Sequence, residues 1–575
     1  MNLFKKFWLF LDKKQKFLFF VLVFFSIIQT ILEMIGIAAA IPFVTFLLQP
    51  ERLPEMGFIT RYLEFNEIVF SNQLIILFCI GFFSIFLIKN LIIIATNKLT
   101  YNFIFSFRKK LFKKIINKIL HQEYIFFVKK GISQIFNTTL NEVNIFSLNV
   151  VRPLIILLGE VLISLGILLL IVLTGNIKGL IFVFPIVIIV ALILKKINSS
   201  IKIWADIRIK QNEKIIDYNL NLINGIKEIL IFGKIKSLMK QFDGSLQLLK
   251  EVDIKHNVVT SYPKVLLEQS VILIFILIIL SLNYLGLENN KIIIILSFYL
   301  LAAYRLVPSI NKIFVSYQAI KWGKPSIPKV MEYYSLSTKN SFIENENISE
   351  SLKFEKNIEL KKICFGYEKN SKIFENLNFS INKNEIIGIS GESGIGKSTI
   401  INLLINLLKA KEGQILVDGR SINDPFELRK YQNLFSISSQ DTYLIDGTIK
   451  DNITFGSNEK FSEIKINEAI KFARLEKMIE NLSLGIETSV GTSIKQLSSG
   501  QKQRISIARS FYSDRKILIF DEATNALDEE NEVSIFENLK KLKSNKTIII
   551  ISHKPDNLKI CDKIYKVENK NLIKI

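Results

Sequence analysis

The chain has 575 residues, and at roughly 150 residues per domain this length predicts three or four domains. Hydrophobic residues make up 49% of it and charged residues 22%, a balance that excludes a disordered or collagen-like protein. The 74 basic residues outnumber the 52 acidic ones, so nucleic acid, an anionic membrane surface and an anionic cargo all remain open as partners. Three cysteines and three histidines, widely spaced, favour neither a disulfide framework nor a structural zinc site.

Long apolar runs lie before residue 310 and stop there. A helix needs about 20 apolar residues to span a bilayer, and most of these runs are that long. The first run follows a basic segment, as a signal-peptide core does, but it is far longer than the usual core of about 7–15 residues. We therefore predict six membrane-spanning helices, over Phe17–Leu48, Leu74–Thr96, Leu154–Thr174, Leu180–Leu194, Val265–Leu285 and Ile292–Val307.

Basic residues predict which connections face the cytoplasm. The segment Lys98–Asn144 carries nine Lys or Arg, whereas residues 50–73 carry more acidic than basic residues. By the positive-inside rule the first of these connections is cytoplasmic, and with six spans both termini are too. The two long inward connections, about 98–150 and 195–262, keep a helical pattern, so we expect the helices to continue beyond the membrane. In a bacterium this topology predicts a multi-pass protein of the inner (cytoplasmic) membrane.

The second half of the chain has the pattern of a soluble α/β domain. Short β-branched runs such as Glu385–Ser390, Ile517–Phe520 and Thr547–Ile551 alternate with helical patterns, which predicts a parallel sheet. We expect a membrane domain with cytoplasmic helix extensions over 1–325, a polar linker over 326–352 and a nucleotide-binding domain over 353–575.

The string GESGIGKST, Gly391–Thr399, fits the P-loop pattern between an apolar strand and a helical run. Its glycines Gly391, Gly394 and Gly396 let backbone N–H groups turn toward phosphate oxygens. Lys397 is expected to neutralise the β- and γ-phosphates and Ser398 to place a hydroxyl on Mg²⁺, while the following helix directs its positive end at the anion.

A second string, ILIFDE, ends a buried strand with two acids. Such a strand is common in α/β cores, but after a P-loop it predicts a metal-binding Asp521 and a Glu522 placed where the γ-phosphate meets water.

The string LSSGQKQR, Leu497–Arg504, resembles the signature sequence of ATP-binding cassette (ABC) proteins. The other marks of that family follow in order: Tyr367 resembles the aromatic residue that stacks on adenine, Gln440 the Q-loop glutamine, Asn525–Asp528 the D-loop and His553 the switch histidine. Six spans before one cassette resemble a half-transporter of the type I ABC exporter class.

The resemblance implies an ATP-hydrolysing translocase that works as a homodimer with ATP and Mg²⁺. Two cassettes close head to tail, so that each ATP lies between the P-loop of one copy and the signature of the other. The residues implied are as follows: catalytic Glu522, His553 and Gln440; nucleotide-binding Tyr367, Gly391, Gly394, Gly396, Lys397, Ser398, Thr399, Ser498, Gly500, Gln501 and Asp528; and Mg²⁺-binding Ser398, Gln440 and Asp521.

This chain departs from the family pattern at Ser499, where the signature usually has Gly, and at Thr492, where many exporters carry Glu. We expect both departures to adjust turnover or coupling without abolishing activity. The segments Tyr124–Ile135 and Asn221–Ile235 resemble the coupling helices that dock into the cassettes, although ordinary amphipathic helices would show the same pattern.

Few acidic residues accompany the basic ones in the predicted spans. Ionisable groups at membrane depth are costly and usually face an internal cavity, so a cationic lumen would suit an anionic cargo such as a phosphate or pyrophosphate head. The alternative is that these side chains reach the interface or pair with the few glutamates. The candidate cargo residues are Lys89, Lys264, Arg305 and Lys312, with Arg152 at the edge of a span.

Three segments, Ile31–Phe43, Asn221–Leu230 and Tyr304–Tyr317, resemble bacterial lipid-linked oligosaccharide flippases of the PglK type. In that family a short amphipathic helix lies in the first outward loop, and Arg52–Phe65 is the segment expected to form it. The resemblance implies that a polyprenyl-diphosphate-linked oligosaccharide is moved to the outer leaflet for protein glycosylation. The resemblance does not specify the identity of the glycan or of the acceptor protein.

Other functions fit the same architecture. Export of a lipid A-like lipid, a peptide or a drug stays open within transporters, and an ATP-gated channel or regulatory subunit is the alternative of another class. The presence of both Glu522 and His553 speaks against a subunit that hydrolyses little. Six spans exclude a soluble ATPase that remodels nucleic acid, so we expect membrane lipid and an anionic glycolipid, and no nucleic acid, as partners.

Overall fold

The computed structural model describes residues 3–39, 43, 72–173, 188, 192, 195, 198–284, 289–337, 350–368, 371–392, 394–422, 424–455, 461–491 and 497–575. The chain divides into two compact units. The helical unit contains Met1–Leu120 and Lys130–Leu336, and the α/β unit contains His121–Lys129 and Ser337–Ile575.

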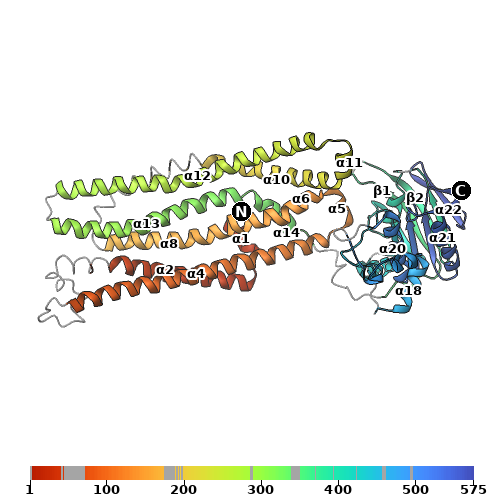
Figure 1. Cartoon of the computed structure of the whole chain (residues 1–575), viewed down its shortest axis with the longest axis horizontal. Coiled ribbons are helices and arrows are strands. Elements are labelled where there is room, and N and C mark those ends of the chain that lie inside the picture. Colours follow the sequence, from red (N-terminus) through yellow and green to blue (C-terminus); the bar gives the residue numbers. More distant parts are fainter. Residues whose placement is uncertain are drawn as a thin grey trace. The chain divides into compact units, whose positions relative to one another are not determined.

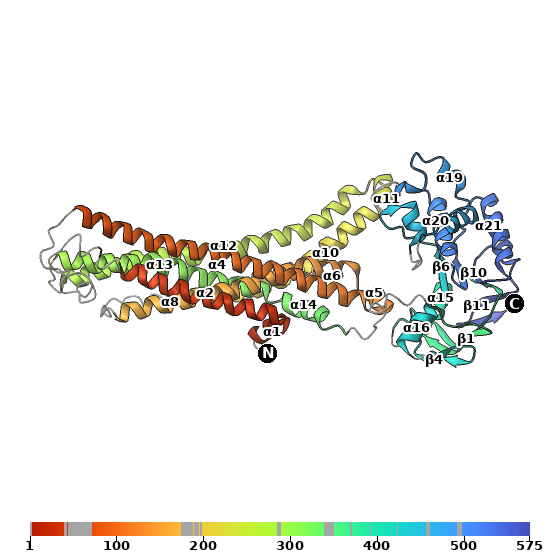
Figure 2. The same ribbon diagram turned by 90° about the horizontal axis from the view of Figure 1, so that it is seen from below.

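Long helices run side by side in the helical unit (Figures 1 and 2). α8 packs against both α2 and α13, while α2 also packs against α4 and α12 against α13. In chain order the described helices are α1 (Leu3–Phe10), α2 (Lys13–Ala38), α4 (Asn72–Leu120), α6 (Ile132–Phe136), the π-helix η2 (Asn137–Glu142), α7 (Val143–Ile145), the π-helix η3 (Phe146–Val151), α8 (Arg152–Leu173), the 3-10 helix η5 (Asn198–Ser200), α10 (Ile201–Asn224), α11 (Ile226–Ile231), α12 (Ile235–Tyr284), α13 (Asn289–Gly323) and α14 (Ser326–Tyr334).

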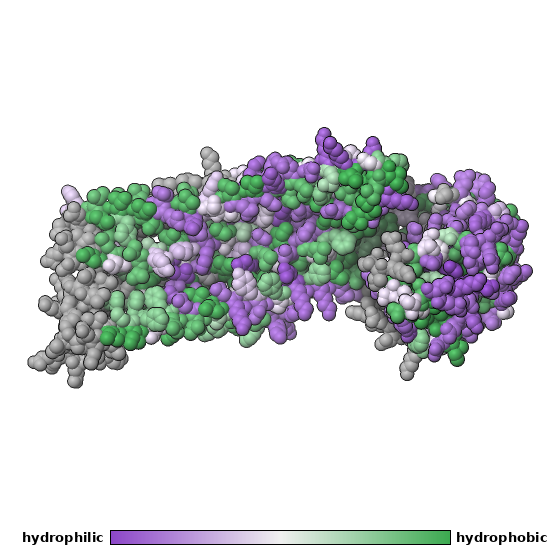
Figure 3. All heavy atoms as spheres, in the orientation of Figure 1, coloured by the Kyte–Doolittle hydropathy of each residue, from purple (hydrophilic) through white to green (hydrophobic). Residues whose placement is uncertain are grey.

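Two of these helices are far longer than a bilayer requires. α4 has 49 residues and α12 has 50, so each extends over roughly 75 Å at about 1.5 Å per residue. The hydrocarbon core is only about 30 Å thick. Hydrophobic side chains gather over the ends of α8, α12 and α13 that carry the apolar runs, and hydrophilic ones over much of α10 (Figure 3). The helices thus continue beyond their apolar parts, as the sequence pattern predicted.

Four described segments are long and apolar enough to cross a membrane: Lys13–Ala38, Cys79–Leu120, Ile132–Leu173 and Ile235–Ser281. They overlap the first, second, third and fifth predicted spans, and the sixth lies within α13. The fourth, Leu180–Leu194, falls almost entirely outside the described residues, as does the predicted amphipathic helix Arg52–Phe65. The helical unit is therefore that of a multi-pass membrane protein, while the number six stays a prediction.

The predicted linker begins too early. α14 occupies Ser326–Tyr334 and buries Ile327, Val330 and Tyr333, one side chain per turn of the helix, against the rest of the helical unit. The helical unit therefore extends to Leu336 rather than to residue 325. The polar stretch that suggested a linker, Leu336–Lys353, lies mostly outside the described residues, over 338–349.

The α/β unit is built on a six-stranded sheet of order β12-β11-β3-β10-β9-β6. β11, β3, β10, β9 and β6 are parallel, and β12 pairs antiparallel at one edge. Its strands are β3 (Ile386–Ser390), β6 (Phe435–Ser439), β9 (Ile517–Asp521), β10 (Thr547–Ile551), β11 (Lys563–Glu568) and β12 (Asn571–Lys574).

The central strands are buried on both faces of this sheet. Ile387 and Ile549 belong to one hydrophobic cluster, and their neighbours Ile386 and Ile548 belong to another, because successive side chains of a strand point to opposite faces. This accounts for the continuous β-branched runs by which the strands were predicted.

The remaining strands form two small antiparallel sheets of order β2-β1-β4-β5 and β7-β8. They are β1 (Asn357–Phe365), β2 (Phe374–Asn382), β4 (Glu412–Val417), β5 (Arg420–Ser421), β7 (Gly447–Thr448) and β8 (Ser489–Val490). The helices of the α/β unit are α5 (Tyr124–Lys129), α15 (Lys397–Leu404), α16 (Pro425–Gln432), α17 (Ile449–Thr454), α18 (Glu463–Phe472), α19 (Glu476–Glu480), the 3-10 helix η6 (Gly485–Glu487), α20 (Ser499–Tyr512), α21 (Glu529–Leu542) and α22 (Pro555–Leu558).

α5 groups with the α/β unit although it is distant in sequence. Ile125 packs against the hydrophobic cluster of that unit, and the Glu123 carboxylate lies 2.6 Å from the Lys409 ammonium. α5 falls within Tyr124–Ile135, one of the two segments predicted to be coupling helices.

Candidate functional site

The candidate site lies at the carboxyl edge of the six-stranded sheet. The register places Ile389 of β3 beside Ile551 of β10, Ile551 beside Asp521 of β9, and Asp521 beside Ser439 of β6. In open α/β sheets, ligands bind beyond this edge. The segments that follow these strands carry the P-loop, His553, Glu522 and Gln440, so four strings far apart in sequence meet at one edge.

The P-loop between β3 and α15 has the backbone that its glycines permit. Gly391, Gly394 and Gly396 have φ angles of 149°, 81° and 109°. At Gly396 a Cβ would also lie 3.0 Å from the Phe374 ring, so a side chain there would be both strained and crowded. This backbone begins the helix α15 with its first N–H groups free for an anion.

Lys397 is the charged centre of the loop. Its side chain is buried, and its ammonium group donates to the carbonyl oxygens of Gly391 at 2.9 Å and Glu392 at 3.1 Å. It also lies 3.4 Å from a carboxylate oxygen of Glu522. Oxygen acceptors thus surround this ammonium group, and phosphate oxygens of a bound nucleotide would offer it the same chemistry.

Asp521 and Ser398 supply the oxygens that suit a divalent metal. Burial raises the pKa of the Asp521 carboxyl above its usual range and the nearby Glu522 charge adds to this, while a hydrogen bond with Ser398 and the Lys397 charge oppose it. A cation bound beside this carboxylate would favour its ionised form. Among the described residues, no group of three or more His, Cys, Asp or Glu could hold a metal on its own.

Glu522 occupies a sharp turn after β9. Its φ of 51° lies in the left-handed region, and its N–H donates to the Ile551 carbonyl at 3.1 Å. The amide nitrogen of Asn525 donates to the Glu522 carboxylate at 3.0 Å. The turn, the backbone hydrogen bond and the Asn525 amide together fix where this carboxylate points. A left-handed conformation at a non-glycine residue is typical of functional sites.

Gln440 and His553 come directly after β6 and shortly after β10, and both are exposed. Tyr367 is half-buried, and its hydroxyl lies 3.2 Å from the Thr399 hydroxyl, which places this ring beside α15. Asp528 is exposed at the start of α21, and Asn531 donates to both of its carboxylate oxygens. The roles of these residues toward a nucleotide stay predictions.

The signature segment begins α20. Ser498 caps this helix by accepting from the Gln501 N–H, and Gln501 accepts from the Ser498 N–H in return. Gly500 is buried, and a Cβ there would lie 2.6 Å from the Ala526 carbonyl oxygen. Ser499, the first departure from the family pattern, is exposed, whereas Thr492, the second, lies outside the described residues.

No hydrogen bond or ion pair links Ser498 or Gly500 to the described residues of Gly391–Thr399. Within the described part of one chain, the signature and the P-loop are thus not joined by polar contacts.

Residues 374–525 match the family model described as ABC transporter. The matched segment runs from β2 through the P-loop, Gln440 and the signature to Asn525, which holds Glu522. His553 lies beyond the match. Tyr367 and Asp528 also lie outside it, whereas Lys397, Asp521 and Glu522 lie within the matched segment.

Curated relatives match this chain over part of its length. An ATP-dependent lipid A-core flippase from Idiomarina loihiensis is 37% identical over 212 residues, and a putative multidrug export ATP-binding/permease protein from Staphylococcus aureus is 40% identical over 217 residues. These matches cover 37% and 38% of this chain. They cover only 36% and 37% of the relatives, so the chain matches little more than a third of their length.

A solved structure shows similarity over almost the whole fold. A bacterial Atm1-family ABC exporter with ATP bound matches with a TM-score of 0.73 and 18% sequence identity, over 95% of this chain and 94% of that chain. The predicted fold class is therefore confirmed: a helical region like that of type I ABC exporters, joined to an α/β ABC transporter domain.

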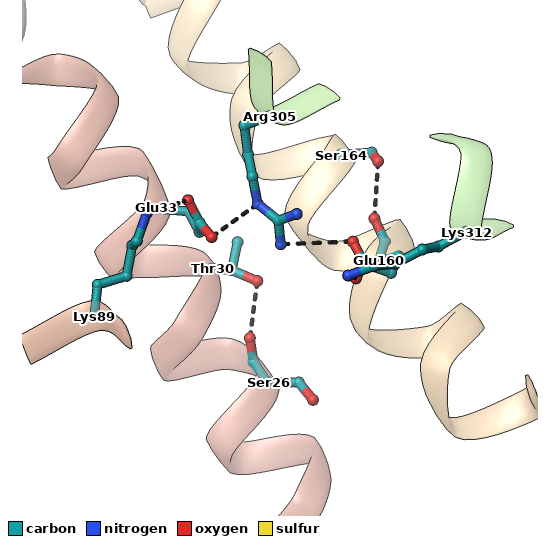
Figure 4. A network of polar contacts seen from close by, with 8 residues as sticks. All are labelled: Ser26, Thr30, Glu33, Lys89, Glu160, Ser164, Arg305 and Lys312. Carbon is teal, nitrogen blue, oxygen red and sulfur yellow. Dashed lines mark hydrogen bonds and ion pairs between the residues drawn. The ribbon is translucent and has the colours of Figure 1, made fainter. Parts of the chain in front are cut away.

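The helical unit that accompanies the ABC transporter domain contains five charged side chains in an alternating row (Figure 4). Glu33 of α2 lies 3.5 Å from Lys89 of α4 and 2.8 Å from Arg305 of α13. Glu160 of α8 lies 3.6 Å from Arg305 and 2.6 Å from Lys312 of α13. We call Lys89, Glu33, Arg305, Glu160 and Lys312 the charge row. It joins four helices and alternates positive with negative.

The charge row corrects the expectation of a free cationic lumen. Lys89 and Arg305 are mostly buried against glutamates, and Lys264 lies 3.9 Å from Glu268 on an exposed face of α12. Charges at membrane depth cost much less when they are paired, which is the alternative that the sequence left open. Lys264 is 69% exposed outside the charge row, and within the row Lys312 keeps a half-exposed side chain, at 51%.

Lys312 lines a cavity of about 430 Å³ between α2, α4, α8 and α13. Its other polar lining residues include Gln29, Asn97 and Arg152. The Arg152 guanidinium donates to the Tyr101 hydroxyl at 2.9 Å. This cavity brings together hydrogen-bonding groups from four helices and is the candidate cargo site.

Most of this lining was not predicted from the sequence. Thr96, Asn97, Thr100 and Tyr101 have i, i+1, i+4 and i+5 spacing, which puts them on one face of α4. That polar face at the end of an apolar run is the signal that could have identified them.

Proposed function

We propose that this chain is one half of an ATP-driven exporter, a translocase that hydrolyses ATP and works as a homodimer in the bacterial inner membrane. The observation that carries the proposal is the meeting of Lys397, Asp521, Glu522 and the segments of Gln440 and His553 at one sheet edge. The apolar helices and the similarity to an exporter fold supply the membrane setting.

Two features of the chain support a second copy. First, the signature residues Ser498 and Gly500 have no bond to the described P-loop, which leaves them available to the nucleotide of another copy. Second, the turn around α11 exposes a cluster of large apolar side chains (Figure 3). Contiguous exposed apolar groups mark interaction surfaces. They are Ile223, Ile226, Leu230, Ile231 and Phe232.

We propose a task in hydrolysis for each of the residues at the sheet edge. Lys397 holds the terminal phosphate oxygens in place of its present carbonyl partners. Glu522, aimed by Asn525, accepts a proton from the water that attacks the γ-phosphorus as the bond to ADP breaks. His553 and Gln440 stand at the same edge to contact the γ-phosphate and the water. Ser398, Asp521 and Gln440 would hold Mg²⁺, which neutralises phosphate charge when bound.

For the cargo we propose a polyprenyl-diphosphate-linked oligosaccharide, moved from the cytoplasmic to the outer leaflet for protein glycosylation. The four-helix cavity supports this because Lys312 and Arg152 suit a diphosphate and the amide and hydroxyl groups suit sugars. An unpaired hydroxyl costs roughly 2–7 kcal/mol in hydrocarbon, so a glycan needs such a polar route. Both termini then lie in the cytoplasm.

A second candidate is the export of another amphiphile. The relative named as a lipid A-core flippase favours a lipid A-like lipid, and the relative named as a putative multidrug exporter favours a drug. A peptide remains the third alternative within exporters. An ATP-gated channel that hydrolyses little would not need a carboxylate fixed as that of Glu522 is.

Reconstituted transport tests both parts of this proposal. The full-length protein is placed in liposomes that contain labelled polyprenyl-diphosphate glycan in both leaflets, and glycan accessibility at the surface opposite the ATP-binding domains is followed with and without ATP.

ATP-dependent movement of the glycolipid is the expected result. Hydrolysis without glycolipid movement, but with movement of a lipid A-like lipid or a dye under the same conditions, would replace the cargo and keep the exporter. Exchange of the glycolipid between the leaflets without ATP hydrolysis would favour the channel.

A further inference from the structure

A second cavity of the helical unit lies between the amino-terminal helices, α4 and α14. Its volume is about 330 Å³, and it is distinct from the four-helix cavity because no residue lines both. Lys110 and Lys114 of α4 line it together with Asp12, which precedes α2. Its walls include the aromatic rings of Phe10 and Phe107. The cavity therefore combines cations with an apolar wall.

Gln15 gives this cavity a buried donor without an acceptor. Its carbonyl oxygen accepts from the Asp12 N–H at 3.2 Å in the capping box that begins α2. Its amide nitrogen is buried and has no partner among the described residues, and Gln15 as a whole is only 3% exposed. Buried polar groups nearly always have a partner. An oxygen-rich ligand in the cavity would supply the missing acceptor.

The charges of the lining favour an anion. The Lys110 ammonium lies 2.7 Å from the Asp12 carboxylate, in a pair that is half exposed. Lys114 donates to the Tyr334 hydroxyl at 2.8 Å, a neutral partner that leaves its charge unbalanced. Asp12 is the one acidic residue in the described lining, against two lysines. The site thus offers two ammonium groups and one amide to a ligand with several oxygen acceptors.

The surroundings point to a lipid as the source of that anion. Leu9 lines the cavity and is 56% exposed, and Phe17 and Phe20 on the adjoining turns of α2 are 68% and 60% exposed. Trp8 is half-buried, and the Lys16 ammonium lies 5.1 Å from its ring centroid, an arrangement typical of the membrane interface. Basic clusters beside a membrane span attract anionic lipid headgroups.

We propose that this cavity binds the phosphate headgroup of an anionic phospholipid. The lipid comes from the leaflet on the side of the membrane where the basic connections of the protein lie. Lys110, Lys114 and the Gln15 amide donate to the phosphate oxygens, and the acyl chains lie along Phe17 and Phe20. The site anchors α1 to α4 and α14 through the lipid. It requires the membrane setting but neither ATP hydrolysis nor any particular cargo.

Lipid titration of the full-length protein, followed by native mass spectrometry, tests this site. The probes are phosphatidylglycerol and phosphatidylcholine with identical acyl chains. We expect the apparent Kd for phosphatidylglycerol to rise about tenfold in Lys110→Ala/Lys114→Ala, since each basic group near a lipid surface contributes appreciably to anionic binding. Binding of phosphatidylcholine should not change. Gln15→Leu, which keeps every charge, should weaken phosphatidylglycerol binding as well.

The control variant Lys109→Ala/Lys113→Ala removes the same charge from α4. Both lysines are exposed, and neither lines the cavity. An equal loss of binding in this variant would show diffuse attraction and overturn the site. Competition by soluble glycerol 3-phosphate as strong as that by phosphatidylglycerol would show a site for free phosphate esters and overturn the lipid. Lys110→Arg/Lys114→Arg should restore binding, and unchanged ATP binding in each variant confirms that the protein is folded.

Discussion

The α/β unit and the helical unit hold their charged residues in opposite ways. In the α/β unit, Lys397 is bound by backbone carbonyls and Glu522 is aimed by Asn525, so their geometry is set by a loop and a turn at strand ends. In the helical unit, Arg305 and its neighbours are bound by each other across four helices. The first site is therefore fixed by short stretches of chain, whereas the second forms only when the four helices have packed together.

Substitution of Glu522, in the locally fixed site, should change activity most. Glu522→Gln keeps the size of the side chain and its contact with Asn525 but cannot accept a proton, so ATP hydrolysis should fall about 10²- to 10⁴-fold. ATP should be retained under conditions in which the wild-type protein releases ADP. Phosphate release and nucleotide retention are the measurements, with the exposed Glu530→Gln as the matched control. Normal steady-state hydrolysis in Glu522→Gln would remove the catalytic assignment.

The next effect tests whether the charge row is held by pairing. Glu33→Gln leaves Lys89 and Arg305 mostly buried with less compensating charge, and breaking a buried pair typically costs about 3–5 kcal/mol of unfolding free energy. Glu268→Gln, at an exposed pair, should cost at most about 1 kcal/mol. Denaturant unfolding of the detergent-solubilised protein measures both.

Because positive and negative side chains alternate in the charge row, a substitution of Arg305 serves as a control for Glu33→Gln. Arg305→Met leaves Lys89 with Glu33 and Lys312 with Glu160, so each remaining charge keeps an opposite partner. This variant should therefore be less destabilised than Glu33→Gln. The reverse order would show that Arg305 contributes through packing rather than through its place in the row.

The site in the α/β unit could be predicted from the sequence better than the charge row, because it depends on local stretches of chain rather than on helix packing. The P-loop, the strand that ends in Asp521 and the signature are contiguous strings, so their residues could be predicted, as could the positions of the first two at strand ends. Lys89, Arg305 and Lys312 were recognised as unusual at membrane depth, but their pairing with Glu33 and Glu160 depends on which helices are neighbours. A single sequence gives the positions of the charged residues but not the packing of the helices, so it does not predict which of them form ion pairs.

The predicted boundary between the two units was wrong for a related reason. The boundary at residue 326 was predicted from a change in composition toward that of a soluble domain. The structure instead buries three side chains of α14, a contact between segments far apart in the sequence that composition does not record. The left-handed φ of Glu522 was likewise not predicted, because Glu is not a residue type that signals such a turn.

A smaller effect is expected at the four-helix cavity. Lys312→Ala removes the half-exposed ammonium group from the candidate cargo site, so the cargo concentration that gives half-maximal transport should rise about tenfold, the loss expected for one charge-assisted hydrogen bond. Lys264→Ala removes an equally large cation from an exposed pair outside this cavity and is the control. If both variants shift transport equally, the cavity is not the cargo site.

The smallest effect links the pKa of Asp521 to stability. Because burial raises its pKa in the folded protein, the nucleotide-free protein binds this proton more tightly than the unfolded chain does. The unfavourable contribution of the carboxylate is therefore present above the folded pKa and is lost as the pH falls through it. At neutral pH, Asp521→Asn should raise the unfolding temperature of the nucleotide-free protein slightly while it abolishes Mg²⁺-dependent ATP binding. A lower unfolding temperature would contradict this account.

The most direct test of the central claim is complementation between two inactive variants. Lys397→Ala disables the P-loop, and Ser498→Asp keeps a helix-capping residue at α20 but places a negative charge where phosphate would lie. Neither variant alone has an intact site if each nucleotide lies between two copies. Co-expressed and purified together, they should recover roughly a quarter of the wild-type hydrolysis, because about half of random pairs are mixed and each mixed pair has one intact site of two. Mixed pairs that stay as inactive as the separate variants would contradict a nucleotide site shared between copies.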